Sequence, residues 1–183
     1  VKKLTLEYDP LWHNGAIAAP EKLYIASLRT VDNSTVQIQS QAKVNYVPQH
    51  IVPLYMQSNN VVWLTLSGKP TTNELSSQLR VWIDANDNNT LEDAELTMVE
   101  VVANKLEYQI AFNLSNFPGI KVGKHRMRLM LSTESDYQKF VTGETIAWGH
   151  VVDLTADVKD GNNLYDYELS LVSLVAPVTG HSL

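Results

Sequence analysis

Hydrophobic and polar residues alternate along much of this chain, with the two-residue period of a half-buried β-strand. Glycine, proline, asparagine and aspartate fill the gaps between the alternating runs, as turns require. Many short strands joined by such turns predict an all-β fold with little helix, an antiparallel β-sandwich of immunoglobulin-like or jelly-roll-like architecture. The alternating runs lie at residues 4–8, 36–39, 62–66, 79–83, 108–114, 127–131 and 165–171.

The segment Glu92–Leu106 fits both a helical and a strand pattern. Apolar residues at helical spacing, Ala94, Met98 and Val101 among them, would suit a helix. Valines close together, however, prefer strands. We therefore expect a short helical turn or a strand here, followed by a strand.

The chain shows no linker that would divide it, and we expect a single β-rich unit over residues 1–183. Residues 1–55 are less regular and are interrupted by four prolines, so they could form an N-terminal subdomain or an extra layer. Residues 56–175 are then expected to form the sandwich.

Composition excludes several classes of protein. The formal net charge of -6 argues against a nucleic-acid-binding protein, which needs a basic face. The absence of cysteine excludes disulfides and thiolate metal sites. We find neither an apolar run long enough for a transmembrane segment nor a recognisable signal peptide. Because the chain begins at Val1, we expect a processed form or a domain of a larger polypeptide.

A loop rich in Asp and Asn follows the run at 79–83 and has the spacing of a calcium-binding loop. Calcium takes about six to eight oxygen ligands, and a loop of about twelve residues supplies them from its first, third, fifth, seventh, ninth and twelfth positions. Each of these positions here holds an oxygen donor, so the sequence predicts one Ca²⁺ ion. The predicted ligands are Asp84, Asn86, Asn88, Thr90 (through its backbone carbonyl), Glu92 and Glu95.

Two further residues of the loop bear on this prediction. Leu91 is the apolar residue that would attach the loop to a core, and Asn89 occupies the sharp turn where glycine is usual. Asparagine tolerates the left-handed backbone that such a turn needs. The alternative is a solvated turn without metal, since Asp and Asn also favour turns by themselves.

The same region resembles the GEVED-type domains of secreted bacterial proteins. The resemblance is carried by Val81-Trp82-Ile83-Asp84 leading into the loop that ends at Glu95, and by Gly123-Lys124-His125-Arg126-Met127-Arg128-Leu129. The closing motif of that family has two candidates here, Gly149–Asp153 and Gly161–Tyr167. The resemblance implies a β-sandwich accessory module attached to a secreted peptidase, a glycan-degrading enzyme or a surface protein. A calcium loop of modest affinity also suits the extracellular medium.

Aromatic and basic residues suggest a second kind of site. An exposed tryptophan offers a flat face on which a sugar ring can stack, although tryptophan is highly buried on average. The candidate ligand-binding residues are Trp12, Trp63, Trp82 and Trp148. Arg80, Arg126 and Arg128 could bind an anion, but we expect Arg126 and Arg128 to pair with carboxylates on neighbouring strands.

Catalysis has little support in the sequence. None of the five histidines has the spacing of a paired metal ligand, and no nucleophile motif is present. We therefore expect a non-catalytic calcium-binding module of a secreted or cell-surface bacterial protein, which recognises a glycan, a peptide or another extracellular protein. The alternatives are a purely architectural or adhesive module and, less favoured, a free-standing hydrolase.

Overall fold

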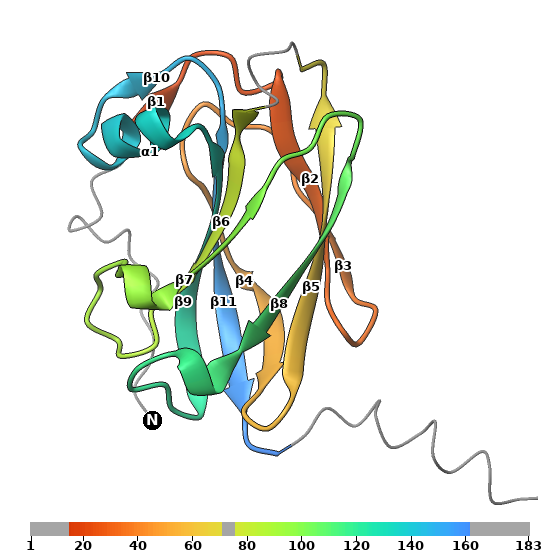
Figure 1. Ribbon diagram of the computed structural model, residues 1–183, viewed down its shortest axis with the longest axis vertical. Coiled ribbons are helices and arrows are strands. Elements are labelled where there is room, and N and C mark those ends of the chain that lie inside the picture. The colour runs from red at the N-terminus through yellow and green to blue at the C-terminus, as the bar shows by residue number, and fades with distance from the viewer. Residues whose placement is uncertain (1–14, 71–75, 162–183) are drawn as a thin grey trace, which may run out of the picture.

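A computed structural model describes residues 15–70 and 76–161 as a β-sandwich with one short helix, which confirms the predicted fold class. Figure 1 shows the arrangement of these elements. The strands are β1 (Ala16–Ile17), β2 (Leu23–Arg29), β3 (Thr35–Gln37), β4 (Asn45–Tyr55), β5 (Asn59–Gly68), β6 (Gln78–Ile83), β7 (Leu96–Glu100), β8 (Glu107–Asn113), β9 (Gly123–Ser132), β10 (Thr145–Ile146) and β11 (His150–Lys159), and the helix is α1 (Glu134–Val141).

Two sheets form the sandwich. One has the strand order β4-β11-β9-β6-β7 and the other β3-β2-β5-β8. Neighbouring strands run antiparallel, except that β4 runs parallel to β11. A separate two-stranded sheet pairs β1 with β10 in parallel. The two parallel pairs are the feature of the topology that the alternation pattern does not indicate.

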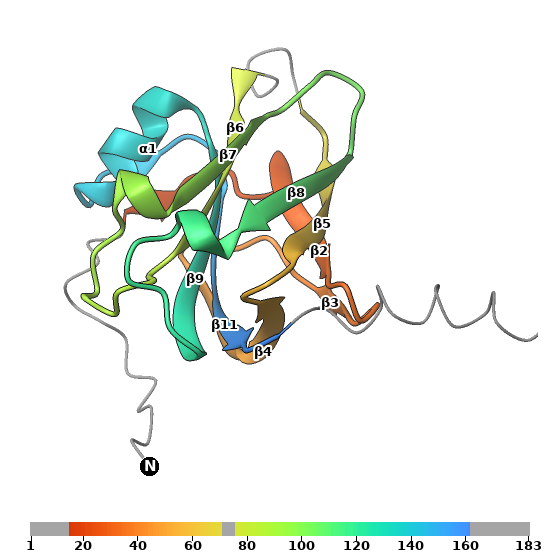
Figure 2. The same ribbon diagram turned by 60° about the horizontal axis from the view of Figure 1, so that its bottom comes forward.

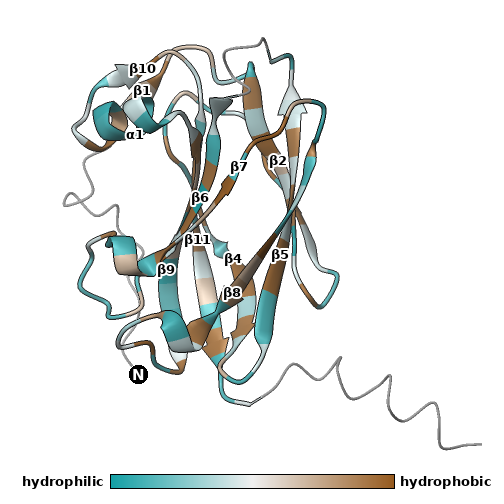
Figure 3. Cartoon of the chain, in the orientation of Figure 1, coloured by the Kyte–Doolittle hydropathy of each residue, from teal (hydrophilic) through white to brown (hydrophobic). Residues whose placement is uncertain are grey.

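The main core lies between the two sheets, where alternate residues of each strand point inward. In β5 the residues Val62, Leu64 and Leu66 are buried, while Trp63 and Thr65 between them are partly exposed. Figure 3 shows such hydrophobic residues as brown bands on the strands of both sheets. Full burial of each of these side chains stabilises the fold by about 1.5–3 kcal/mol. The opposite side of this core comes from Leu79, Val81, Ile83, Met127, Leu129, Leu131, Val152 and Leu154.

A third layer with α1 lies against part of the outer face of the five-stranded sheet (Figure 2), and most residues of β6 on both faces are buried. A second hydrophobic cluster fills this interface with Ile17, Trp82, Met130, Phe140, Ile146 and Val151. The indole of Trp82 stacks on the ring of Tyr137 from α1, with centroids 5.4 Å apart. The N-cap of the helix is Thr133, whose hydroxyl accepts a hydrogen bond from the Asp136 backbone N–H at 3.1 Å.

The N-terminal third does not form a separate layer in the described residues. Strand β1 contributes to the third layer, β2 and β3 belong to the four-stranded sheet, and β4 belongs to the five-stranded sheet. The segment after residue 92 contains a short 3₁₀ turn, Asp93–Glu95, followed by β7, as expected. The runs expected at 4–8 and 165–171 lie outside the described residues.

Within residues 15–70 and 76–161, no helix has the length and hydrophobicity needed to span a membrane.

His150 at the start of β11 is a fully buried titratable group in the core. Its Nδ1 accepts a hydrogen bond from the backbone N–H of Ile25 at 3.1 Å. Burial lowers the pKa of His150 to about 4, because the cationic form loses its hydration. Protonation would also convert the Nδ1 acceptor into a donor and so break the bond to β2.

This burial predicts acid sensitivity. Below its ordinary pKa of 6.5 the unfolded chain binds a proton on His150 that the folded protein does not take up until about pH 4. Stability therefore falls as the pH drops through this window. Between pH 7 and about pH 4.5 the wild type should lose roughly 2 kcal/mol more unfolding free energy than His150→Gln, which keeps an acceptor but does not titrate. Urea unfolding at both pH values measures this difference, and equal losses would contradict the assignment.

Candidate metal centre

The predicted calcium loop is the connection between β6 and β7, two antiparallel neighbours. The register pairs Trp82 with Leu96, so the chain leaves β6 and enters β7 at the same place. This brings together Asp84 and Glu95, the first and last predicted ligands. The side chain of Asp84 is only 1% exposed and that of Glu95 is fully buried. Sheet pairing thus places two carboxylates at one point inside the protein.

Asp84 organises the first half of the loop. Its Oδ1 accepts a hydrogen bond from the Asn88 backbone N–H at 3.1 Å, and its Oδ2 accepts one from Asn89 at 3.0 Å. Its own backbone N–H donates to the Arg126 carbonyl at 3.0 Å, which continues the pairing of β6 with β9. The loop therefore curls around the Asp84 carboxylate.

Glu95 closes the second half of the loop. Its Oε1 accepts hydrogen bonds from the backbone N–H groups of Ala85 at 2.8 Å and Asn86 at 3.4 Å. Its Oε2 accepts one from the backbone N–H of Glu92 at 3.4 Å. The last residue of the loop is thereby bonded to its beginning.

The middle ligands form a connected group nearer the surface. Glu92 accepts a hydrogen bond from the side-chain amide of Asn86 and another from that of Asn88, both at 3.1 Å. The amide oxygens of the two asparagines accept bonds from backbone N–H groups two residues onward, those of Asn88 at 3.0 Å and Thr90 at 2.8 Å. The structure thus brings five of the six predicted ligands into one hydrogen-bonded loop through their side chains. For Thr90 it shows only an exposed residue whose backbone N–H is bonded within the loop.

The backbone of the loop turns where the sequence indicates. Asn89, in the position where glycine is usual, has φ 61°, in the left-handed region. Asp87 also has a left-handed backbone, with φ 58°. Asn and Asp adopt this conformation more readily than other non-glycine residues, so the loop is formed with little strain. Leu91 packs against the second hydrophobic cluster, in the anchoring role predicted for it.

The pKa values of the two buried carboxylates, Asp84 and Glu95, are both raised. Burial raises the pKa of Asp84, against the hydrogen bonds from Asn89 and Asn88 that lower it. Burial likewise raises the pKa of Glu95, and the neighbouring charge of Asp84 adds to that increase. Burying an ionised carboxylate costs free energy unless an opposite charge compensates it. A cation held between these residues would supply that charge.

His125 is a neighbour of the loop that the sequence does not reveal. It is almost fully buried, and its Nδ1 lies 2.9 Å from an Asp87 carboxylate oxygen and 3.2 Å from the Asp84 carbonyl oxygen. Its Nε2 lies 2.7 Å from the Lys121 carbonyl. The β6–β9 register places His125 beside this loop, so only the sheet pairing could have indicated it. Asp87 is exposed, and its carboxylate contacts this imidazole.

The donors fit calcium better than a softer metal. Carboxylate, amide and backbone oxygens are the ligands of Ca²⁺, whereas transition metals favour imidazole or thiolate. Within residues 15–70 and 76–161, no three His, Asp or Glu side chains converge closely enough to hold a metal by themselves. A Ca²⁺ ion here would take oxygen ligands from the amides of Asn86 and Asn88 and from backbone carbonyls as well as from carboxylates.

The tryptophans predicted to bind a ligand have different environments. Trp82 is 1% exposed because α1 covers it, and Trp148 is 5% exposed because it packs in the main core. Neither presents a free ring face, so the expectation of an exposed platform is not met at these two positions. Trp63 is partly exposed on the outer face of β5. Trp12 lies outside the described residues.

Two arginines of the five-stranded sheet, Arg80 and Arg128, bind carboxylates. Arg128 makes two hydrogen bonds to Asp153 on the neighbouring strand, at 2.6 and 2.7 Å, as predicted. Arg80 is buried, forms an ion pair with Glu134 and stacks over the ring of Tyr137. These pairs connect β6, β9, β11 and α1.

The raised pKa values predict how pH affects the metal-free protein. As the pH rises past the ordinary carboxyl pKa of 3.8, the unfolded chain ionises Asp84 while the folded protein resists, so stability falls. In the presence of a chelator, the wild type should lose stability relative to Asp84→Asn between about pH 3.5 and 7. The expected loss is about 1.4 kcal/mol for each unit by which the pKa is raised.

Thermal unfolding followed by circular dichroism measures this trend. Asp93→Asn removes an exposed carboxylate from the same loop and serves as the control, with a pH profile parallel to that of the wild type. A parallel profile for Asp84→Asn as well would refute the assignment of the buried charge to Asp84.

Comparisons with known proteins give distant structural neighbours. The extracellular domain of a protein described as a hybrid two-component system from B. thetaiotaomicron is similar at 11% sequence identity and a TM-score of 0.31, over 78% of this chain. This chain spans only 15% of the length of that one. AggA, the major subunit of aggregative adherence fimbriae type I from Escherichia coli, is similar at 10% identity and a TM-score of 0.21, over 62% of this chain and 91% of that one. A search of curated proteins gave no match.

A family model gives a clearer result. Residues 78–156 match the GEVED domain, from the beginning of β6 into β11. The match includes the whole Asp84–Glu95 loop, the Gly123–Leu129 segment and Gly149–Asp153, one of the two candidates for the closing motif. The other candidate, Gly161–Tyr167, lies beyond it. This chain therefore carries a GEVED-like domain.

Proposed function

We propose that this chain is a non-catalytic accessory module of a secreted or cell-surface bacterial protein, and that Ca²⁺ bound in the Asp84–Glu95 loop stabilises it. The observation that carries the proposal is the burial of Asp84 and Glu95 side by side at the ends of the β6–β7 connection, where burial raises both pKa values. Calcium would compensate two buried negative charges and hold the connection in one conformation.

The position of the loop favours a structural role for the metal. The loop is attached to the fold at Asp84, whose backbone N–H pairs with β9, and at Leu91, which packs in the second cluster. The turn Phe117–Ile120 also approaches the loop, since a Cβ on Gly119 would lie 3.4 Å from the Cβ of Asn86. An ion here would bind together segments that are far apart in the sequence.

Several observations support an extracellular setting. The chain has no cysteine, so a metal is a suitable means of stabilising a secreted domain that lacks disulfides. Two of the ligands are neutral asparagines, which lowers the charge of the site and suits the weaker calcium sites of extracellular modules. The GEVED match agrees with the accessory role that the sequence resemblance implies.

A purely architectural or adhesive module is the second candidate. The burial of Trp82 and Trp148 favours it, because covered tryptophans stabilise the fold and bind no ligand. The partly exposed Trp63 favours recognition instead. Both candidates share the calcium loop and differ in whether a ligand binds elsewhere on the surface.

Calcium should raise the melting temperature of the purified chain. At a free concentration about a hundred times Kd, binding stabilises the folded state by about 2.7 kcal/mol. For a domain of this size that corresponds to roughly 5–10 °C. Differential scanning calorimetry with calcium and then with excess chelator measures the shift.

Substitutions in the loop test which of its residues the calcium-dependent shift in melting temperature requires. Asp84→Ala and Glu95→Gln should each remove most of the calcium-dependent shift, because each removes a carboxylate from the site. Asp93→Ala removes an exposed carboxylate between the predicted ligands and should retain the shift in full. Equal melting temperatures of the wild type with calcium and with chelator would rule out the proposal.

A further inference from the structure

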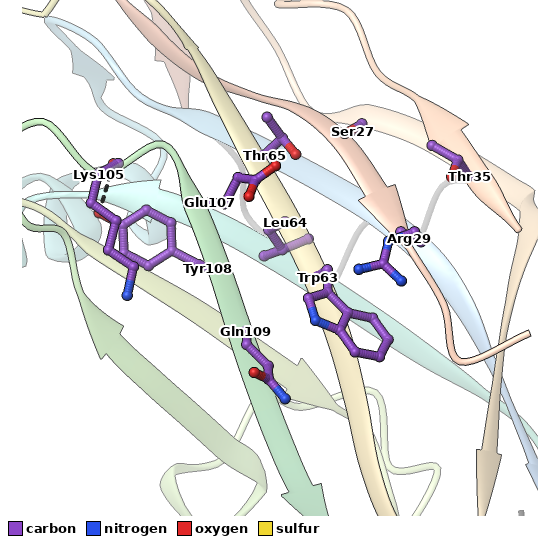
Figure 4. A pocket seen from close by; sticks show the side chains of 10 residues that line it. All are labelled: Ser27, Arg29, Thr35, Trp63, Leu64, Thr65, Lys105, Glu107, Tyr108 and Gln109. Carbon is purple, nitrogen blue, oxygen red and sulfur yellow. Dashed lines mark hydrogen bonds between the residues drawn. The ribbon is translucent and has the colours of Figure 1, made fainter. Parts of the chain in front are cut away.

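The outer face of the four-stranded sheet carries a pocket of about 480 Å³ (Figure 4). This face lies on the opposite side of the sandwich from α1, and no described element covers it as α1 covers the five-stranded sheet. Polar and charged side chains from four strands line it, together with the indole of Trp63. Polar groups held in fixed positions, as here, can orient a bound ligand and give specificity.

Strand register builds this pocket in two rows. In one row Arg29 on β2 lies opposite Trp63 on β5, and Trp63 lies opposite Gln109 on β8. In the other, Thr65 on β5 lies between residues of β2 and β8, with Glu107 as its partner on β8. Residues on strands are held more rigidly than residues on loops, so the pocket is formed before a ligand arrives.

The indole of Trp63 is held in place by Arg29. The guanidinium of Arg29 lies 4.1 Å from the centre of the Trp63 ring, in a cation–π contact. Its Nη1 also donates a hydrogen bond to the side chain of Asn33 at 3.3 Å. The ring is thus held on the sheet surface with part of it exposed, and the charge of Arg29 lies over one of its two faces.

A second positive charge lies at the other end of the pocket. The hydroxyl of Tyr108 bonds to three backbone groups of the β7–β8 connection, including the Val102 N–H at 2.9 Å and the Lys105 carbonyl at 3.0 Å. These bonds hold the connection against the sheet, and the Lys105 ammonium lies 4.9 Å from the Tyr108 ring centre. Lys105 is therefore positioned by a buried anchor.

The charge of this pocket differs from that of the protein. The chain has a net charge of -6, but the pocket holds Arg29 and Lys105 against a single carboxylate, Glu107. Across residues 15–70 and 76–161, no carboxylate forms an ion pair with either cation. Two cations without an acidic partner on an acidic protein favour an anionic ligand.

We propose that this pocket binds an oligosaccharide that carries a carboxylate group. The C–H face of a sugar ring would pack on the face of Trp63 opposite Arg29, and its hydroxyl groups would form hydrogen bonds with Thr65, Glu107 and Gln109. The carboxylate would interact with Arg29 or Lys105 through charge-assisted hydrogen bonds. This inference goes beyond the proposed function and does not depend on the calcium loop, which belongs to the other sheet.

A glycan array tests the inference. The full chain is applied in buffer with chelator to oligosaccharides that contain glucuronate, galacturonate or sialic acid, and to neutral counterparts of the same chain length. Binding to acidic members is expected, and Trp63→Ala and Arg29→Ala should each weaken it at least tenfold. Lys159→Ala, which removes an exposed charge from the other sheet, should bind as the wild type does.

Three outcomes would overturn the inference: no binding to any glycan, equal binding to acidic and neutral members, or undiminished binding by a Trp63→Ala variant whose circular dichroism is unchanged. The Asp84→Ala variant separates this result from the calcium proposal. If it remains folded, it should still bind the acidic glycans while it loses the calcium-dependent melting shift. Loss of glycan binding by that folded variant would contradict the independence of the two sites.

Discussion

The burial of two carboxylates at one end of a β-hairpin is the constraint on which the rest of this structure depends. Pairing of β6 with β7 forces Asp84 and Glu95 together, and burial raises the pKa of each. Their oxygens accept backbone N–H bonds that close the loop, but these bonds do not supply a positive charge. The Ca²⁺ ion that we propose would supply that charge, and it would draw the amide oxygens of Asn86 and Asn88 inward.

The two candidate sites, the loop after β6 and the pocket beside Trp63, belong to different sheets. The third layer covers part of the outer face of the five-stranded sheet, where Arg128 pairs with Asp153 and Arg80 with Glu134. The four-stranded sheet is covered on one face only, and its outer face carries Arg29 and Trp63 without a covering layer. The proposed metal in the loop after β6 and the proposed ligand on the four-stranded sheet would therefore act independently.

The sequence predicted those features that depend on local pattern. Alternation predicted the strands. The pattern of Asp and Asn residues predicted the position of the loop and its left-handed turn at Asn89. Features that depend on sheet order were not predictable. Trp82 fits an outward strand position, yet α1 covers it, and no local signal indicates where a helix will pack. Likewise His125 reaches the loop, and Arg29 meets Trp63, only because distant strands pair.

A crystal structure of the chain grown with calcium, with anomalous diffraction used to identify the ion, tests the central claim most directly. The account predicts one anomalous peak in the Asp84–Glu95 loop, at about 2.3–2.6 Å from carboxylate oxygens of both residues. Well-ordered Asp84 and Glu95 side chains with no peak between them, at a calcium concentration that saturates such sites, would contradict it.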